Sequence, residues 1–259
     1  MTTIIITGTA TVTATVMAGE ERLSREELAP LEPISHAALY RLATWLSPAY
    51  PVGGFAYSSG IEWAVEMGDI ADRASLLDWL TAMLAEGAGF NDAVLMAAAH
   101  RAASNADEAA LVEVAELAAA LVPTRERHLE TTTLGNAFMA VTCAAWPCTP
   151  LTRLKELWSG PVAYPVAVGV ACAGHAIPVV AAAHAFLAAV TANWVSAAVR
   201  LVPLGHTDSQ FALAAIEPVV ADTARRAIGA TLDGLGGATF RADIASARHE
   251  TQYTRLFRS

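Results

Sequence analysis

The sequence predicts an all-α fold in which residues 34–259 form a single-domain bundle of about nine or ten helices behind a flexible N-terminal extension, residues 1–33. Of the 259 residues, 54% are apolar and only 16% are charged, and much of the apolar content is alanine, which lets helices pack closely. Apolar residues recur at helical spacing along most of the chain after residue 33. Outside the extension, no segment alternates polar and apolar residues convincingly as a strand would.

The first two helices are expected on either side of a rigid loop. A helix over 34–46 must end before Pro48, because a proline ring fixes φ and removes a backbone donor. Ser58 and Ser59 are candidate N-caps for a helix over 60–67, since serine side chains accept hydrogen bonds from the free N–H groups of a first turn. The loop between these helices is therefore expected to be sharply shaped.

Capping residues and prolines divide the middle of the chain. The helix that follows Asp107 is stopped by Pro123, and a short amphipathic helix is expected over 151–158. The other expected helix starts are Asp72 or Ser75, Asn91 or Asp92 for a helix to about Ala103, and Thr124.

The run from Leu157 to Val199 contains no Asp, Glu, Lys or Arg, and its length would accommodate two membrane spans. It is dominated by Ala, Gly and Val, is interrupted by prolines, and lacks the long Leu/Ile/Phe stretches of lipid-facing helices. We therefore expect two buried core helices, broken near residues 174–178, and no membrane as a partner.

Turn residues organise the end of the chain. Residues 203–205, Pro-Leu-Gly, make a turn before a helix capped by Thr207 or Asp208, in which Pro218 is expected to introduce a kink. A glycine-rich loop over 232–239 leads to a last helix from about residue 241.

Charge and cysteine content limit the partners and the compartment. The net charge of −9, without any run of basic residues, argues against nucleic acid or an anionic membrane as a main partner. Cys143, Cys148 and Cys172 make an odd, sparse set that is typical of a reducing compartment. Because the first basic residue is Arg22, the weakly apolar N-terminus lacks the positive region of a secretory signal. A cytoplasmic location is expected.

Sequence patterns for catalysis are weak. The chain has no GxSxG nucleophile motif and no phosphate-binding loop, which would need a lysine after its glycines, and its only lysine is Lys155. The carboxylate pairs Glu113/Glu116 and Glu126/Glu130 fall at helical spacing and are expected on solvated helix faces. The chain is therefore not expected to be an enzyme.

Histidine and cysteine positions leave open an alternative function, a metal-binding enzyme of unknown substrate. His175 lies three residues after Cys172, and His184 lies nine further along the uncharged run. Zinc prefers such ligands, but the sequence offers no obvious second close pair, and the spacing of Cys143 and Cys148 is not that of a zinc knuckle. Buried or interfacial side chains are the default interpretation of these residues.

Three segments carry residue types that helix packing does not require. Ser47–Trp63 reads SPAYPVGGFAYSSGIEW, in which Gly53 and Gly54 permit a positive φ or a close backbone approach beside aromatic side chains. Arg200–Gln210 reads RLVPLGHTDSQ, and the chain ends in HETQYTRLFRS. The crowding of aromatic and turn-forming residues favours a shaped binding surface.

These segments resemble the signatures of the urease accessory protein F (UreF) family. SPAYPVGGFAYSSGIEWAVE, RLVPLGHTDSQ and ETQYTRLFRS occur in the order and at the spacing of that family, and RERHLETTTLGNAF is similar to its weaker central helix. The resemblance covers roughly residues 39–259. The chain departs from the family pattern with Tyr50 for the common Leu, Arg200 for Lys, His206 for Gln and Ser209 for Gly.

The resemblance implies a homodimer with a non-catalytic role in urease maturation. Members of the family bridge a second accessory protein, UreD (UreH in some systems), and the GTPase UreG, and regulate the GTP-dependent delivery of nickel to apo-urease. Nickel is therefore expected to be handled by the complex, with no cofactor bound permanently to this chain. His206 is a candidate for contacting nickel, against the alternative that it only replaces the hydrogen bonding of Gln.

The loop and the tail are the candidate partner-binding elements. The loop would dock the second protomer or the GTPase, since aromatic side chains with few rotatable bonds are frequent interface anchors. The tail would become ordered on binding the UreD-type partner. The candidate partner-binding residues are Pro51, Gly53, Gly54, Phe55, Tyr57, Ser58 and Glu62 in the loop region, and Tyr253, Arg255, Leu256, Phe257 and Arg258 in the tail.

Overall fold

The computed structural model describes residues 34–259, and in this range the regular secondary structure is entirely helical, which confirms the all-α prediction. The predicted flexible extension, residues 1–33, lies outside the described residues. The helices are α1 (His36–Trp45), α2 (Ile61–Glu66), α3 (Arg73–Glu86), α4 (Ala88–Ser104), α5 (Glu108–Ala120), α6 (Arg125–Ala145), α7 (Thr149–Leu157), α8 (Tyr164–Gly174), α9 (Val179–Val199), α10 (His206–Gly229) and α11 (Phe240–His249), with 3-10 turns η1 (Gly54–Ala56) and η2 (Leu232–Gly234).

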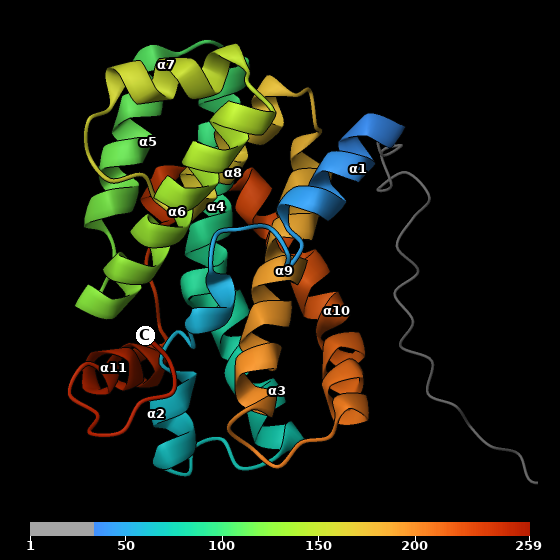
Figure 1. Cartoon of the computed structure of the whole chain (residues 1–259), viewed down its shortest axis with the longest axis vertical. Helices are drawn as coiled ribbons and strands as arrows, with labels where there is room; N and C mark the ends of the chain where they lie inside the picture. The colour runs from blue at the N-terminus through green and yellow to red at the C-terminus, as the bar shows by residue number, and fades with distance from the viewer. Residues whose placement is uncertain (1–33) are drawn as a thin grey trace, which may run out of the picture. The chain divides into compact units, whose positions relative to one another are not determined.

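Helix α8 forms the centre of the fold, packed against α4 and α6 (Figure 1). Its residues from Pro165 to Cys172 are all buried, as expected for a helix that is apolar on every side. Gly169 allows α8 to approach α4 closely, because a Cβ there would lie 2.3 Å from the carbonyl oxygen of Met96. Helices α9 and α10 run side by side, and both contact α3 and α4 (Figure 1).

The uncharged run forms two helices broken at residues 175–178, as predicted. Helix α8 has 11 residues, about 16 Å of helix, which is too short for a hydrocarbon core of about 30 Å. Helix α9 is long and apolar enough to cross a membrane by length and composition alone, although 39% of its most apolar window is buried inside the chain. Its Phe186 and Trp194 side chains are in the core, so α9 contributes to packing as expected.

Several predicted caps are observed. The side chains of Asp72, Asp107 and Thr124 accept hydrogen bonds from the backbone N–H groups of Ser75, Ala110 and Arg127, respectively. These contacts begin α3, α5 and α6 where the sequence predicts them.

One predicted N-cap and two predicted helix starts differ from the structure. The N-cap of α2 is Gly60, in the left-handed region with φ of +83°, and not Ser58 or Ser59. Helix α4 begins at Ala88 rather than at Asn91 or Asp92, whose side chains instead contact Gly236 and Arg127. Helix α10 begins at His206, and its predicted caps, Thr207 and Asp208, lie inside the first turn. The Ser58 hydroxyl still accepts from the Glu62 N–H in the first turn of α2, at 3.4 Å. Ser59, Asn91 and Asp92 instead make tertiary contacts.

Candidate functional site: the loop, the tail and their buried ion network

The three unusual sequence segments meet at one place in the fold. The Arg258 N–H donates to the carbonyl of Ala56 at 2.8 Å, and the Ser58 N–H donates to the carbonyl of Ser259 at 2.6 Å. Arg200, at the end of α9, donates from Nη2 to the carbonyl of Phe55 at 2.8 Å. We call this assembly of residues 47–63 with residues 250–259 the loop–tail unit.

The loop exposes one aromatic side chain and buries two. Gly53 has a φ of +80°, as the sequence allows, and turns the chain into η1. Phe55 is 67% exposed, whereas Tyr57 is buried. Tyr50 is also buried, and its hydroxyl hydrogen-bonds the Thr142 hydroxyl at 2.9 Å. The two buried tyrosines anchor the loop, so that Phe55 is left on the surface.

Glu62, near the start of α2, holds the tail by its backbone. Its Oε1 accepts from the Leu256 N–H at 2.6 Å, and its Oε2 accepts from the Phe257 N–H at 2.9 Å. Hydrogen bonds to an ionised carboxylate are about twice as strong as neutral ones. Phe257 is buried, and its ring lies 4.2 Å from the guanidinium carbon of Arg200. The tail is therefore docked on the loop.

His249, the last residue of α11, connects Glu62 to a second carboxylate. Its Nε2 lies 2.9 Å from Glu62 Oε2, and its Nδ1 lies 2.5 Å from Glu126 Oε2. Arg255 Nη1 donates to the other oxygen of Glu126 at 2.6 Å. The His249 side chain is 0% exposed, and both glutamates are buried.

A second buried cluster lies one helical turn further along α6. Arg127 Nη1 donates to Glu130 at 2.8 Å and to the Ser59 hydroxyl at 3.1 Å. Ser59 in turn donates to Glu130 at 2.9 Å and accepts from Trp194 Nε1 at 2.8 Å. The Ser259 hydroxyl also donates to Glu130, at 3.0 Å. The tail thus reaches both clusters.

The expectation that Glu126 and Glu130 lie on a solvated helix face is wrong. Both are buried, because α11 and the tail cover this side of α6. Sequence reasoning did not identify these two glutamates, Ser59 or His249 as site residues. The available signal was their position inside segments already noted as unusual, the central RERHLETTTLGNAF helix, the SPAYPVGGFAYSSGIEW loop and the HETQYTRLFRS tail.

The candidate partner-binding residues divide by burial. Tyr57, Ser58, Glu62 and Phe257 are buried and hold the loop–tail unit together, so they are not available as a docking surface. The tail is expected to become ordered on binding the UreD-type partner, and in this structure its backbone is hydrogen-bonded to Glu62. The exposed candidates are Pro51, Phe55, Tyr253, Arg255, Leu256 and Arg258, with Gly53 and Gly54 half-buried.

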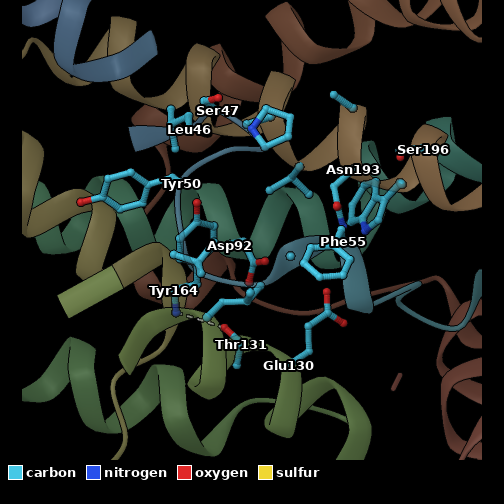
Figure 2. Close-up of a pocket in the computed structure, with 18 of the residues that line it drawn as sticks. Leu46, Ser47, Tyr50, Phe55, Asp92, Glu130, Thr131, Tyr164, Asn193 and Ser196 are labelled. Atoms are coloured by element: carbon cyan, nitrogen blue, oxygen red, sulfur yellow. Dashed lines mark hydrogen bonds between the residues drawn. The ribbon is translucent and has the colours of Figure 1, made fainter. Parts of the chain in front are cut away.

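A cavity of about 140 Å³ opens beside Phe55 between the loop, α6 and α9 (Figure 2). Its walls are largely apolar and aromatic, while Asp92 and Glu130 face its interior together with Asn193 (Figure 2). Burial raises the pKa of Asp92 to about 6, and the charge of Arg127 opposes this rise. A hydrogen bond from the Tyr164 N–H to Thr131 Oγ1 at 3.2 Å fixes another side of the cavity (Figure 2).

The His and Cys residues considered as alternative metal ligands do not form a cluster. His175 Nε2 contacts the carbonyl of Trp146 at 3.0 Å. Cys172 is buried, and burial raises the pKa of its thiol to about 12. His206 is exposed at the first residue of α10, and His184 is exposed on α9. Within residues 34–259, no group of three or more His, Cys, Asp or Glu side chains is arranged to hold a metal ion.

Comparison with known proteins agrees with the resemblance in the sequence. Residues 70–217 match the UreF family model. The chain is 64% identical over 223 residues to the urease accessory protein UreF of Rhodopseudomonas palustris strain BisA53, covering 86% of this chain and 94% of the relative. It is 57% identical over 244 residues to the urease accessory protein UreF of Bradyrhizobium diazoefficiens, covering 94% of this chain and all of the relative. The chain therefore belongs to the UreF family of urease accessory proteins.

Proposed function

We propose that this chain is a non-catalytic scaffold that joins a UreD/UreH-type accessory protein to a UreG-type GTPase and regulates GTP-dependent nickel insertion into apo-urease. Its family membership supports a role in urease maturation. In this proposal the chain acts as a cytoplasmic homodimer, and nickel is the cargo of the complex rather than a resident cofactor of the chain.

The loop–tail unit is the observation that best supports a docking role. Phe55 and Leu256 are 67% and 63% exposed. The backbone of each is nevertheless held in place, because the Phe55 carbonyl accepts from Arg200 and the Leu256 N–H donates to Glu62. Arg258 is exposed in the same segment of the tail. A surface that is ordered before binding loses less conformational entropy on association, and exposed aromatic and arginine side chains are frequent anchors of interfaces.

Substitution of the exposed residues tests the proposal. Phe55→Ala and Leu256→Ala remove side chains that make few contacts within the chain, so both variants should fold normally. Each should weaken co-purification with the UreD/UreH-type protein or with the UreG-type GTPase by at least about tenfold, equivalent to about 1.4 kcal/mol of binding free energy. Urease activation in a reconstituted system should fall with the lost contact.

Phe211→Ala is the matched control, since Phe211 on α10 is 57% exposed but lies outside the loop–tail unit. It should leave capture of both partners unchanged. The proposed docking role of the loop–tail unit is wrong if Phe55→Ala and Leu256→Ala both retain full partner capture and full urease activation.

A further inference from the structure

We propose that His249 is a positioning residue: held as an imidazolium between Glu62 and Glu126, it keeps the Glu62 carboxylate in place to bind the tail backbone. This inference rests on the proposed docking role only for its functional meaning. The arrangement itself is a property of the chain alone and can be tested without any partner.

With both carboxylates ionised, the contacts of the ring require hydrogen on both of its nitrogens. Nε2 faces a Glu62 oxygen at 2.9 Å, and Nδ1 faces a Glu126 oxygen at 2.5 Å. An ionised carboxylate only accepts hydrogen bonds, and neutral imidazole has a single N–H. A neutral ring would therefore set a nitrogen lone pair against one carboxylate, inside a site that water does not reach.

Charge balance leads to the same conclusion. The groups that face His249 are Glu62 from α2, Glu126 from α6 and Arg255 from the tail. With a neutral ring these four side chains would carry a net charge of −1, and with an imidazolium they are neutral. An uncompensated buried charge is strongly unfavourable. The neighbouring Arg125–Glu250 ion pair is exposed and neutral in sum, so it does not alter this balance.

The consequence for the tail follows from the shared carboxylate. The same Glu62 oxygen that faces His249 also accepts the Phe257 N–H at 2.9 Å, while the other oxygen accepts the Leu256 N–H. Without the imidazolium, the two glutamates would have to separate or one would have to take up a proton. Either change weakens the hydrogen bonds from the tail backbone to Glu62, and these bonds hold the segment in which Leu256 and Arg258 are exposed.

Amide hydrogen exchange in His249→Gln tests this directly. A glutamine carries both of its N–H donors on one nitrogen and an acceptor oxygen beside it, so it cannot present a donor at both positions of the ring nitrogens, and it carries no charge. The amides of Leu256 and Phe257 should exchange at least about tenfold faster in this variant than in the wild type. The same change at the exposed His184 of α9 is the control and should leave these two amides unchanged.

The double variant Glu126→Gln/His249→Gln separates a charge role from simple packing. Removing the second carboxylate restores net neutrality between Glu62 and Arg255, and the new amide of residue 126 can donate to the amide oxygen of residue 249. Protection of the tail amides should therefore recover most of the loss seen in His249→Gln. Tail amides that exchange still faster in the double variant would show that His249 acts only by filling space, and would overturn the proposal.

Nuclear magnetic resonance of the wild-type chain provides a test that does not depend on variants folding. With ¹⁵N-labelled histidine at pH 7, both ring nitrogens of His249 should show the shifts of an imidazolium and a slowly exchanging hydrogen. A neutral tautomer at this pH would overturn the proposal. These readouts concern the free chain, so failure of the docking proposal, seen as intact partner capture by Phe55→Ala and Leu256→Ala, would be distinguishable from failure of this one.

Discussion

Two carboxylates, those of Glu130 and Asp92, share the guanidinium of Arg127 as a hydrogen-bond donor. Arg127 contacts Ser59, Glu130 and Asp92, but its distance to Asp92 is 3.4 Å, longer than the 2.8 Å to Glu130. Asp92 is therefore the least well compensated carboxylate of the cluster, and its side chain, 19% exposed, borders the cavity beside Phe55. Burial raises the pKa of Asp92 more than the charge of Arg127 lowers it, so the pKa rises to about 6.

This shift predicts how stability changes with pH. Because the pKa of Asp92 is raised from 3.8 in the unfolded chain to about 6 in the folded chain, the folded state binds the proton more tightly. The stabilisation that the folded chain gains from protonated Asp92 is fully present below pH 3.8, and it is lost as the pH rises through 6. A pKa raised from 3.8 to about 6 corresponds to roughly 3 kcal/mol in the free energy of unfolding between the two ends of this pH range. The difference in unfolding free energy between Asp92→Asn and the wild type, measured by urea unfolding, should therefore favour the variant more at pH 7 than at pH 4.5. A stability difference that does not change with pH would contradict this, and Asp233→Asn, on the exposed turn η2, controls for the substitution itself.

At the scale of single elements, the sequence predicts where helices lie better than what covers them. Helical spacing and side-chain caps identify α3, α5 and α6 because these signals are local in the chain. The same spacing places Glu126 and Glu130 on one face of α6 but cannot show that α11 and the tail pack on that face. The two glutamates are then wrongly predicted to be exposed to solvent. In the structure they are buried, and they pair with His249 and Arg127, respectively.

The start of α2 gives a prediction at this scale. Gly60 has a φ of +83°, and a Cβ there would lie 2.8 Å from the backbone nitrogen of Ser246 on α11. Gly68, just after α2, has a similar φ of +79° but open space around its missing Cβ. Gly68→Ala should therefore show only the left-handed backbone cost, about 1–2 kcal/mol. Gly60→Ala should cost at least about 1 kcal/mol more, since α11 must move.

Thermal and urea unfolding of the two variants measures this difference. Equal destabilisation by Gly60→Ala and Gly68→Ala would show that the close approach of α2 and α11 is not needed for folding. A larger effect at Gly60 accompanied by faster exchange of the tail amides would link that approach to the position of His249, since this histidine is the last residue of α11.

Across the whole molecule, the loop–tail unit joins segments that are about 200 residues apart in the chain. The sequence identifies both segments as unusual, and both resemble signatures of the UreF family. It does not show that they contact each other, because pairing at this sequence separation depends on how all the intervening helices pack. For the same reason, Tyr57 and Phe257 could not be distinguished from Phe55 and Leu256 as buried or exposed before the fold was known.

A docked tail should contribute to the stability of the folded chain as well as to binding. Removing residues 256–259 takes away the buried ring of Phe257 and leaves the Glu62 carboxylate without its two backbone donors. Together these losses should cost at least about 3 kcal/mol, which for a chain of this size lowers the melting temperature by roughly 6–12 °C. Tyr253→Ala is the control, because Tyr253 is fully exposed and its loss should leave the melting temperature unchanged. If the truncated chain instead melts at the wild-type temperature, the tail does not stabilise the free protein, and its order must then depend on a partner.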